Sequence, residues 1–151
     1  MDEGIRGDMA AALLIERLVR DAYSDRAPGS VTPLQWAILR TVKRARPDNC
    51  SQNWIARFVG VTAAPANRAI KALQRHGAVT ISRDHNDSRK TIISLTAEGE
   101  VMLKDDPIHS ITRKLAKLDA HKKVEFRNIL QQLLLVTDDD ERDRAAGIDS
   151  R

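Results

Sequence analysis

The sequence has little of the residue types that build disulfide, metal and cofactor sites. Its 151 residues include one cysteine, Cys50, which excludes an internal disulfide and an all-cysteine metal site. The four histidines are scattered without the spacing of metal ligands. No glycine-rich phosphate loop follows a predicted strand. We therefore expect no catalysis, no metal and no cofactor.

Aromatic residues and long apolar runs are also scarce. The aromatic residues are Tyr23, Trp36, Trp54, Phe58 and Phe126, and most occupy apolar helical positions, which argues against a stacking surface for single-stranded RNA. No run of about 18 apolar residues occurs, and the chain starts acidic rather than with a cationic leader. We expect a cytoplasmic protein with no membrane partner.

Positive charge is concentrated in the middle of the chain. Residues 31–96 hold 11 basic and 3 acidic side chains, a net charge of +8, whereas the rest sums to −4 and the whole chain to +4. A basic centre between neutral or acidic ends suits a surface that binds a polyanion. The alternative is a basic face that is only solvated.

Helical periodicity and capping residues predict four helices before residue 77. The first spans about 8–24; the second begins at Pro33 after Thr32; the third follows Ser51 and ends at Gly60. The fourth begins near Ala63, with an apolar face and an outward face that carries cations and no acid. This pattern favours a helix that enters a DNA groove, the alternative being an ordinary amphipathic surface helix.

Two β-favouring segments follow the fourth helix, "AVTISR" and "RKTIISLT", and the turn formers "DHNDS" separate them. They predict a hairpin with a charged tip that can reach a phosphate backbone or a minor groove. The alternative is a charged turn that protects an exposed edge strand. Helices followed by this hairpin predict a winged helix-turn-helix.

The C-terminal third predicts a broken fifth helix and an apolar sixth helix. Thr96 caps the first part of the fifth, Asp106 and Pro107 interrupt it, and Asp119 caps the sixth. The first, fifth and sixth helices offer more apolar surface than the winged region needs, so we expect a homodimer. Packing within an all-helical monomer is the alternative.

The segment "DSRKTIISLTAEG" resembles the signature D-x-R-x-x-x-I-x-L-T-x-x-G, which closes the wing in the MarR family of bacterial transcription regulators. "TPLQWAILRTV", "SQNWIARFVGV" and "NRAIKALQRHGAV" are similar to that family's second, third and recognition helices. The resemblance implies a homodimer that binds a pseudo-palindromic operator and represses transcription until a small ligand or an oxidant releases it. It also implies that Asn67 and Arg68 face bases, and that Asp87 and Arg89 shape and point the wing.

The predicted fold class is therefore mainly α with a small β-hairpin wing, a winged helix-turn-helix with N- and C-terminal dimerisation helices. Residues 31–96 form the DNA-binding region, 8–30 and 97–137 the dimerisation region, and 138–151 an acidic tail expected to be disordered. The predicted function is that of a dimeric transcription regulator that binds double-stranded DNA at a specific sequence. We expect it to act as a repressor that a small ligand releases from DNA. The alternative is a winged-helix module that binds protein or RNA and has only weak affinity for DNA.

The predicted site residues follow from the outward face of the fourth helix, the wing tip and the family positions. We predict Lys71, Arg75, Arg83 and Arg89 as contacts to phosphate or the minor groove. The predicted DNA contacts together are Ser51, Gln52, Thr62, Ala64, Pro65, Asn67, Arg68, Lys71, Arg75, Arg83, His85, Asp87, Arg89 and Lys90.

The family resemblance also implies an effector pocket where the first, second and fifth helices meet the winged region, and three residues are candidates for it. They are Trp36 as an aromatic wall, Arg40 as a cation for a carboxylate ligand, and His109 as a titratable group. In the alternative interpretation Trp36 is a core residue and Arg40 a surface or DNA-backbone charge. Cys50 is either a redox sensor beside Arg46 or a small buried residue.

Overall fold

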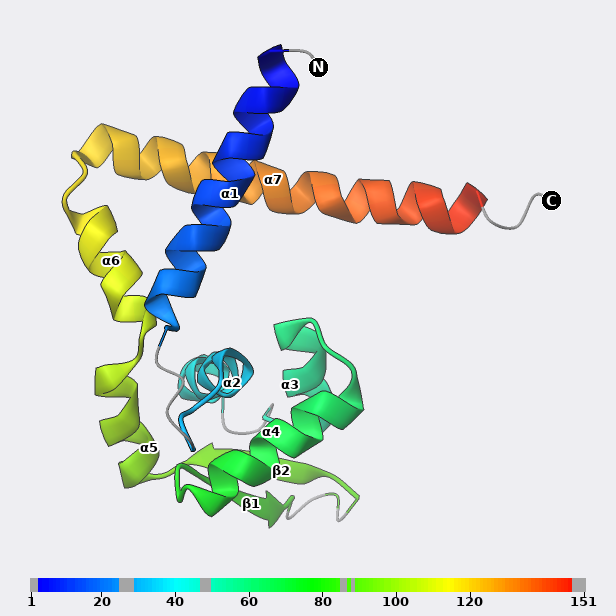
Figure 1. Cartoon of the computed structure of the whole chain (residues 1–151). Coiled ribbons are helices and arrows are strands. Elements are labelled where there is room, and N and C mark those ends of the chain that lie inside the picture. Colours follow the sequence, from blue (N-terminus) through cyan, green and yellow to red (C-terminus); the bar gives the residue numbers. More distant parts are fainter. Residues whose placement is uncertain (1–2, 25–28, 47–49, 85–86, 88, 148–151) are drawn as a thin grey trace. The chain divides into compact units, whose positions relative to one another are not determined.

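The computed structural model describes residues 3–24, 29–46, 50–84, 87 and 89–147. The chain forms two compact units, Met1–His109 and Ser110–Arg151. The first holds α1 to η2, and the second holds most of α6 and all of α7 (Figure 1). The elements are α1 (Glu3–Ala22), α2 (Pro33–Arg44), α3 (Gln52–Val59), α4 (Ala63–Arg75), β1 (Val79–Arg83), β2 (Thr91–Leu95), α5 (Ala97–Met102), the 3-10 helix η2 (Leu103–Asp105), α6 (Ile108–Ala116) and α7 (Ala120–Gly147).

The starts of α2 and α3 are fixed by the caps predicted from the sequence. The Thr32 hydroxyl accepts the amide of Gln35, whose side-chain oxygen accepts the Thr32 amide at 2.8 Å, a complete capping box. The Ser51 hydroxyl accepts the amide of Trp54 at 3.2 Å. α3 ends at Gly60, whose φ of 73° is left-handed. These boundaries are confirmed.

The core lies between α2, α3, α4 and the hairpin. The apolar face of α4, formed by Ala66, Ala69, Ile70 and Leu73, is buried, which confirms the predicted orientation of that helix. Trp36 is 8% exposed and therefore a core residue, as in the alternative interpretation of its role. The largest fully buried side chains of the unit are Ile38, Leu39, Ile55, Ile70, Leu73, Ile93, Val79 and Cys50.

The hairpin is antiparallel, and β1 pairs with β2 from Val79 opposite Leu95 to Arg83 opposite Thr91. A short third segment joins it, because Ser51 forms a β-bridge with Ile92 and the carbonyl of Cys50 accepts the Ile93 amide at 2.8 Å. The sequence did not predict this segment, since two residues give no strand pattern. The bridge anchors the wing to the start of α3.

The predicted break of the fifth helix is confirmed at Asp106 and Pro107. α5 begins after Thr96, whose hydroxyl accepts the Gly99 amide at 3.0 Å, and η2 follows it. α6 starts at Ile108, whose amide donates to a carboxylate oxygen of Asp106 at 2.9 Å. Asp106 therefore caps the new helix.

α7 continues further than predicted. Asp119 caps it as expected, accepting the Lys122 amide at 2.9 Å. The helix runs to Gly147, through most of the predicted disordered tail, while residues 148–151 lie outside the described part. Residues 138–146 contain four Asp, which are weak helix formers, but neither proline nor glycine, so no residue in this stretch breaks the helix.

Candidate DNA-binding surface

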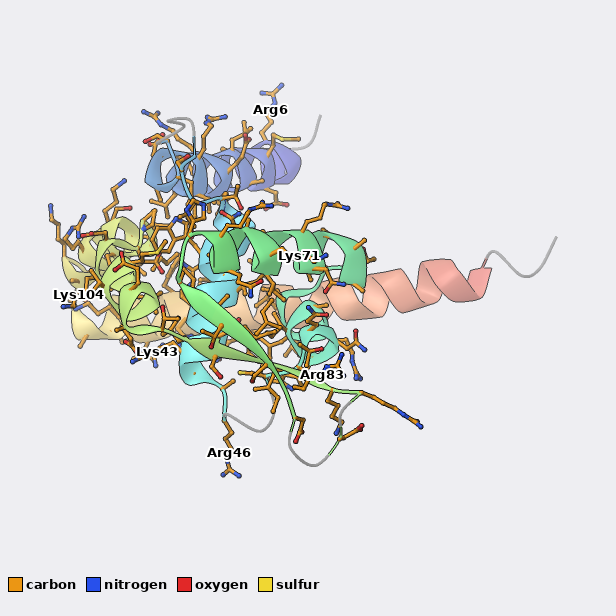
Figure 2. The ribbon with its side chains drawn as sticks, turned by 90° about the horizontal axis from the view of Figure 1, so that it is seen from below. Arg6, Lys43, Arg46, Lys71, Arg83 and Lys104 are labelled. Atoms are coloured by element: carbon orange, nitrogen blue, oxygen red, sulfur yellow. The ribbon has the colours of Figure 1, made fainter. Side chains whose placement is uncertain are left out.

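The outward face of α4 carries three exposed cations, Arg68, Lys71 and Arg75. Among the described residues none of them forms an ion pair, so their charge is not neutralised within the chain. No acid occurs between residues 63 and 75. Figure 2 shows Lys71 extending from α4. A helix face with this charge can follow the phosphates beside a major groove.

The first turn of α4 is built from small side chains. Thr62, Ala63 and Ala64 are exposed and Pro65 is half-buried. Thr62 occupies the N-cap position of α4, but its hydroxyl makes no cap bond to the helix, unlike those of Thr32 and Ser51. Backbone can therefore approach a flat partner closely at this end.

Asn67, a predicted base contact, is half-buried rather than fully exposed. Its side-chain oxygen is buried and has no hydrogen-bond partner among the described residues. Burying a carbonyl oxygen without a hydrogen-bond donor costs free energy. A rearrangement that supplies a donor to this oxygen would therefore be favourable.

The wing turn is organised by Asp87. Its carboxylate accepts the Arg89 amide at 3.0 Å, and its carbonyl accepts the Lys90 amide at 2.9 Å. Arg83, Arg89 and Lys90 are exposed, and Figure 2 labels Arg83, the last residue of β1. His85, another predicted contact, lies outside the described residues. The described part of the wing thus presents exposed cations around a turn that is held by the hydrogen bonds of Asp87.

The predicted contacts on α3 are Ser51 and Gln52. The Ser51 hydroxyl is engaged in the cap, and its backbone is bridged to β2. Gln52 is half-buried at the first position of the helix. The structure thus brings α3, α4 and the wing together on one unit, with Ser51 as a supporting residue of that arrangement.

Arg40 is held by an ion pair that the sequence did not reveal. Its Nη1 donates to both carboxylate oxygens of Asp106, at 2.8 and 2.7 Å, and its Nη2 donates to the Tyr23 hydroxyl at 3.2 Å. Burial lowers the pKa of Arg40, but the hydrogen bonds and attraction from Asp106 and Tyr23 outweigh it, so the pKa lies above its ordinary value. Because 66 residues separate Arg40 from Asp106, no local pattern could indicate the pair.

A cavity of about 530 Å³ lies beside this ion pair, between the end of α1, the start of α2 and the segment after η2. Trp36 lines it, as the predicted pocket required. Arg40 and His109 are not among its described lining residues, and the Nε2 of His109 lies 3.1 Å from the carbonyl of Leu103. The sequence missed Tyr23 and Asp105 as cavity residues, because they occur in segments read only as helix ends.

Cys50 is 1% exposed, and burial raises the pKa of its thiol. A raised pKa keeps the sulfur protonated and unreactive at neutral pH. Its surroundings favour the small buried residue over the redox sensor.

No group of three or more potential metal ligands gathers within the described ranges. Within the same ranges, no helix combines the length and apolar character needed to cross a bilayer.

Comparisons with known proteins show which protein family and which solved structures this chain resembles. Residues 30–90 match the model of the MarR family, whereas no curated protein matches the chain. A probable transcriptional regulator from Pseudomonas aeruginosa is similar at 26% identity and a TM-score of 0.64, covering 81% of this chain and 95% of that one.

Two further solved structures share the fold. The MepR–DNA complex from Staphylococcus aureus has 18% identity and a TM-score of 0.68, with 85% of this chain and 96% of that one covered. Bordetella bronchiseptica BpsR, whose DNA binding is regulated by 6-hydroxynicotinic acid, has 18% identity and a TM-score of 0.60, with 82% and 98% covered. The resemblance inferred from the sequence is confirmed: the winged-helix region of this chain matches the MarR family model and is similar to a solved probable transcriptional regulator.

Proposed function

We propose that the chain is a homodimeric, sequence-specific regulator that binds double-stranded DNA and represses transcription until a small effector releases it. The observation that carries the proposal is the exposed cationic face of α4, free of acid, with an exposed cationic wing on the same unit. Arg68 and Asn67 are assigned to base edges, and Lys71, Arg75, Arg83 and Arg89 to phosphate or the minor groove.

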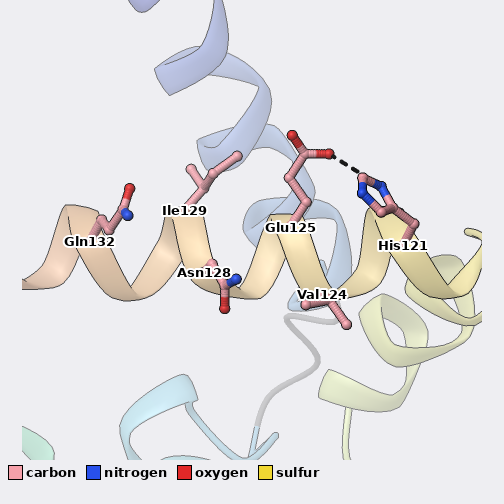
Figure 3. Close-up of a pocket in the computed structure, with 6 residues that line it drawn as sticks. All are labelled: His121, Val124, Glu125, Asn128, Ile129 and Gln132. Carbon is pink, nitrogen blue, oxygen red and sulfur yellow. Dashed lines mark ion pairs between the residues drawn. The ribbon is translucent and has the colours of Figure 1, made fainter.

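Homodimerisation is supported by exposed apolar side chains on α1 and α7. Each helix leaves large apolar residues exposed in the isolated chain, and a second copy of the chain would cover them. The resulting two-fold axis would match a two-fold symmetric operator. α7 also has a surface depression of about 360 Å³ lined by six of its own residues (Figure 3). The uncovered residues are Met9, Leu13, Leu14, Ile15 and Val19 on α1, and Val124, Ile129, Leu133, Leu134 and Leu135 on α7.

Effector release is supported by the cavity beside Trp36. Its volume lies within the range of about 300–1,000 Å³ that is usual for small-molecule sites. BpsR, which shares the fold, is regulated by a small ligand. For an effector to release DNA, it must bind the DNA-incompetent arrangement of the dimer more tightly than the competent one.

The alternative is a winged-helix module that binds RNA or protein. Phe58 is the observation in its favour, since it is 65% exposed and stacks on Trp54 with ring centroids 5.0 Å apart. The other aromatic side chains are buried or half-buried, so a row of stacking platforms for single-stranded RNA is lacking in the described structure.

Sequencing of duplexes selected from a random pool by the purified protein tests the proposal. We expect enrichment of one sequence with two-fold symmetry. A triple variant, Arg68→Ala, Lys71→Ala and Arg75→Ala, should enrich nothing. A charge-matched control at the end of α6 and in the turn after it, Arg113→Ala, Lys114→Ala and Lys117→Ala, should keep the selected sequence. No enrichment by the wild type, together with binding of single-stranded RNA, would favour the alternative.

A further inference from the structure

The side chains that line the cavity beside Trp36 favour a ligand of one charge over the other. The cavity combines two aromatic rings with hydroxyl groups and one acid, and its lining is contributed by the end of α1, the residues before and at the start of α2, and the segment around Asp106. The described lining residues are Ala22, Tyr23, Ser30, Val31, Thr32, Pro33, Trp36, Asp105 and Pro107.

The cation expected to hold an acidic ligand is already neutralised. Arg40 contacts both oxygens of Asp106, and Asp106 is 3% exposed and also accepts the Ile108 amide. Releasing Arg40 for a ligand carboxylate would leave Asp106 buried without its counter-charge, which is strongly unfavourable. The pair therefore contributes no net charge to the cavity.

Among the described lining residues, the ionic group is the exposed carboxylate of Asp105. No cationic side chain is among the described lining residues, and no ion partner of Asp105 is found in the described part of the chain. The rings of Tyr23 and Trp36 add a second preference, since the faces of aromatic rings attract cations. The hydroxyls of Ser30 and Thr32 can accept hydrogen bonds from an ammonium group.

We infer that this cavity binds a small organic cation with an apolar body, an aromatic or alicyclic amine, and that it rejects carboxylates of the same shape. The apolar body packs against Trp36, Val31 and Pro33, and the ammonium group faces Asp105. The inference rests on the proposed function in one respect only, namely that the cavity is the effector site.

Asp105 also lies next to Asp106, the residue that joins η2 to α6 and pairs with Arg40. Asp105 and Pro107 line the cavity and flank Asp106, which holds Arg40 and caps the first amide of α6. Tyr23, another lining residue, accepts a hydrogen bond from the same Arg40. An amine bound between Tyr23 and Asp105 therefore touches two residues that are directly linked to the ion pair.

Three probes with one ring and different charge test the inference: benzylamine, benzyl alcohol and benzoate. Each is titrated at pH 7 into the DNA-free protein, and binding is followed by the indole NMR signal of Trp36. The chain has two tryptophans, so the Trp54→Phe variant assigns that signal by elimination.

We expect benzylamine to bind about three- to tenfold more tightly than benzyl alcohol, given one exposed ion pair and one cation–π contact, and benzoate to bind most weakly. Asp105→Asn should remove most of the advantage of the amine. The control Asp21→Asn removes a nearby acid that is not a described lining residue and should leave that advantage unchanged.

Benzoate binding as tightly as benzyl alcohol would overturn the inference, and so would an amine advantage that survives Asp105→Asn. Because DNA is absent from the titration, these outcomes do not depend on operator binding. A failed duplex selection would instead overturn the proposed function and leave the ligand class standing.

Discussion

At the scale of single residues, Arg68 and Lys71 lie on the same exposed face of α4 but are assigned different tasks. Arg68→Ala should weaken binding to the selected duplex by about 1–3 kcal/mol and flatten the base preference at one position. Lys71→Ala should weaken all duplexes and lower the slope of log affinity against log salt concentration by about one. Titrations at several salt concentrations measure both effects. Equal losses on selected and random DNA for Arg68→Ala would contradict a base contact.

Asp106 has two structural roles, and only one of them could be predicted from the sequence. Its cap to α6 was readable from the Asp-Pro pair, whereas its ion pair with Arg40 depends on a contact between distant segments. A short local pattern predicts hydrogen bonds within a turn. It carries no information about which distant side chain the tertiary fold places against Asp106.

Replacement of Asp106 separates these two roles. Asp106→Ala should lower the free energy of unfolding by about 3 kcal/mol, the lower end of the range for a broken buried pair, because Arg40 keeps partial access to solvent. Asp106→Asn keeps an oxygen for the Ile108 amide, so it should cost about 1 kcal/mol less than the alanine variant. Urea unfolding measures the differences, with Asp105→Asn as the neighbouring control, expected within about 0.5 kcal/mol of wild type. Equal stability of Asp106→Ala and the control would contradict the role of the pair.

At the scale of elements, the starts of α2, α3, α5 and α7 were predictable because each is set by residues within one turn. The first helix was predicted to span about 8–24, whereas α1 begins earlier, at Glu3, and ends at Ala22. Thr32, Ser51, Thr96 and Asp119 all cap the helices that the sequence assigned to them. The bridge between Ser51 and Ile92 was not predictable, since it depends on how α3 packs against the hairpin. The cavity was anticipated through Trp36 alone, because its other walls come from three separate segments.

The T-x-x-G part of the wing signature has a physical explanation in the start of α5. The Thr96 hydroxyl donates to the Gly77 carbonyl at 2.6 Å and accepts the Gly99 amide at 3.0 Å. A Cβ on Gly99 would lie 2.2 Å from the Ala78 carbonyl oxygen. Threonine and glycine together allow α5 to pack directly against the end of α4 and the start of β1.

Gly99→Ala should therefore destabilise the protein. The added methyl group must displace backbone at Ala78, so we expect a loss of about 1–3 kcal/mol in the free energy of unfolding. Gly7→Ala is the matched control, because it is also helical but its added Cβ would meet no atom within 4 Å. That control should be neutral or stabilising by up to about 1 kcal/mol. Thermal or urea unfolding gives both values, and similar values for the two variants would contradict the close approach.

At the scale of the whole molecule, the uncovered apolar residues of α1 and α7 set an expectation about assembly. Leu14, Ile129 and Leu133 are 66%, 47% and 52% exposed in the single chain, whereas Leu18 is half-buried. Periodicity predicted which residues form these stripes. It did not identify what covers them, since an apolar stripe has the same pattern against its own chain or a second one.

Sedimentation velocity at micromolar concentration should give a dimer. Burying a leucine is worth about 1.5–3 kcal/mol, so Leu133→Lys should raise the dimer dissociation constant at least tenfold. The control Gln131→Lys introduces the same charge at another exposed position of α7 and should leave the dimer intact. In parallel, Leu133→Lys should weaken binding to a two-fold symmetric duplex far more than binding to a single half-site, because only the dimer contacts both halves. A wild-type monomer that binds the symmetric duplex tightly would contradict the assignment of these helices to dimerisation.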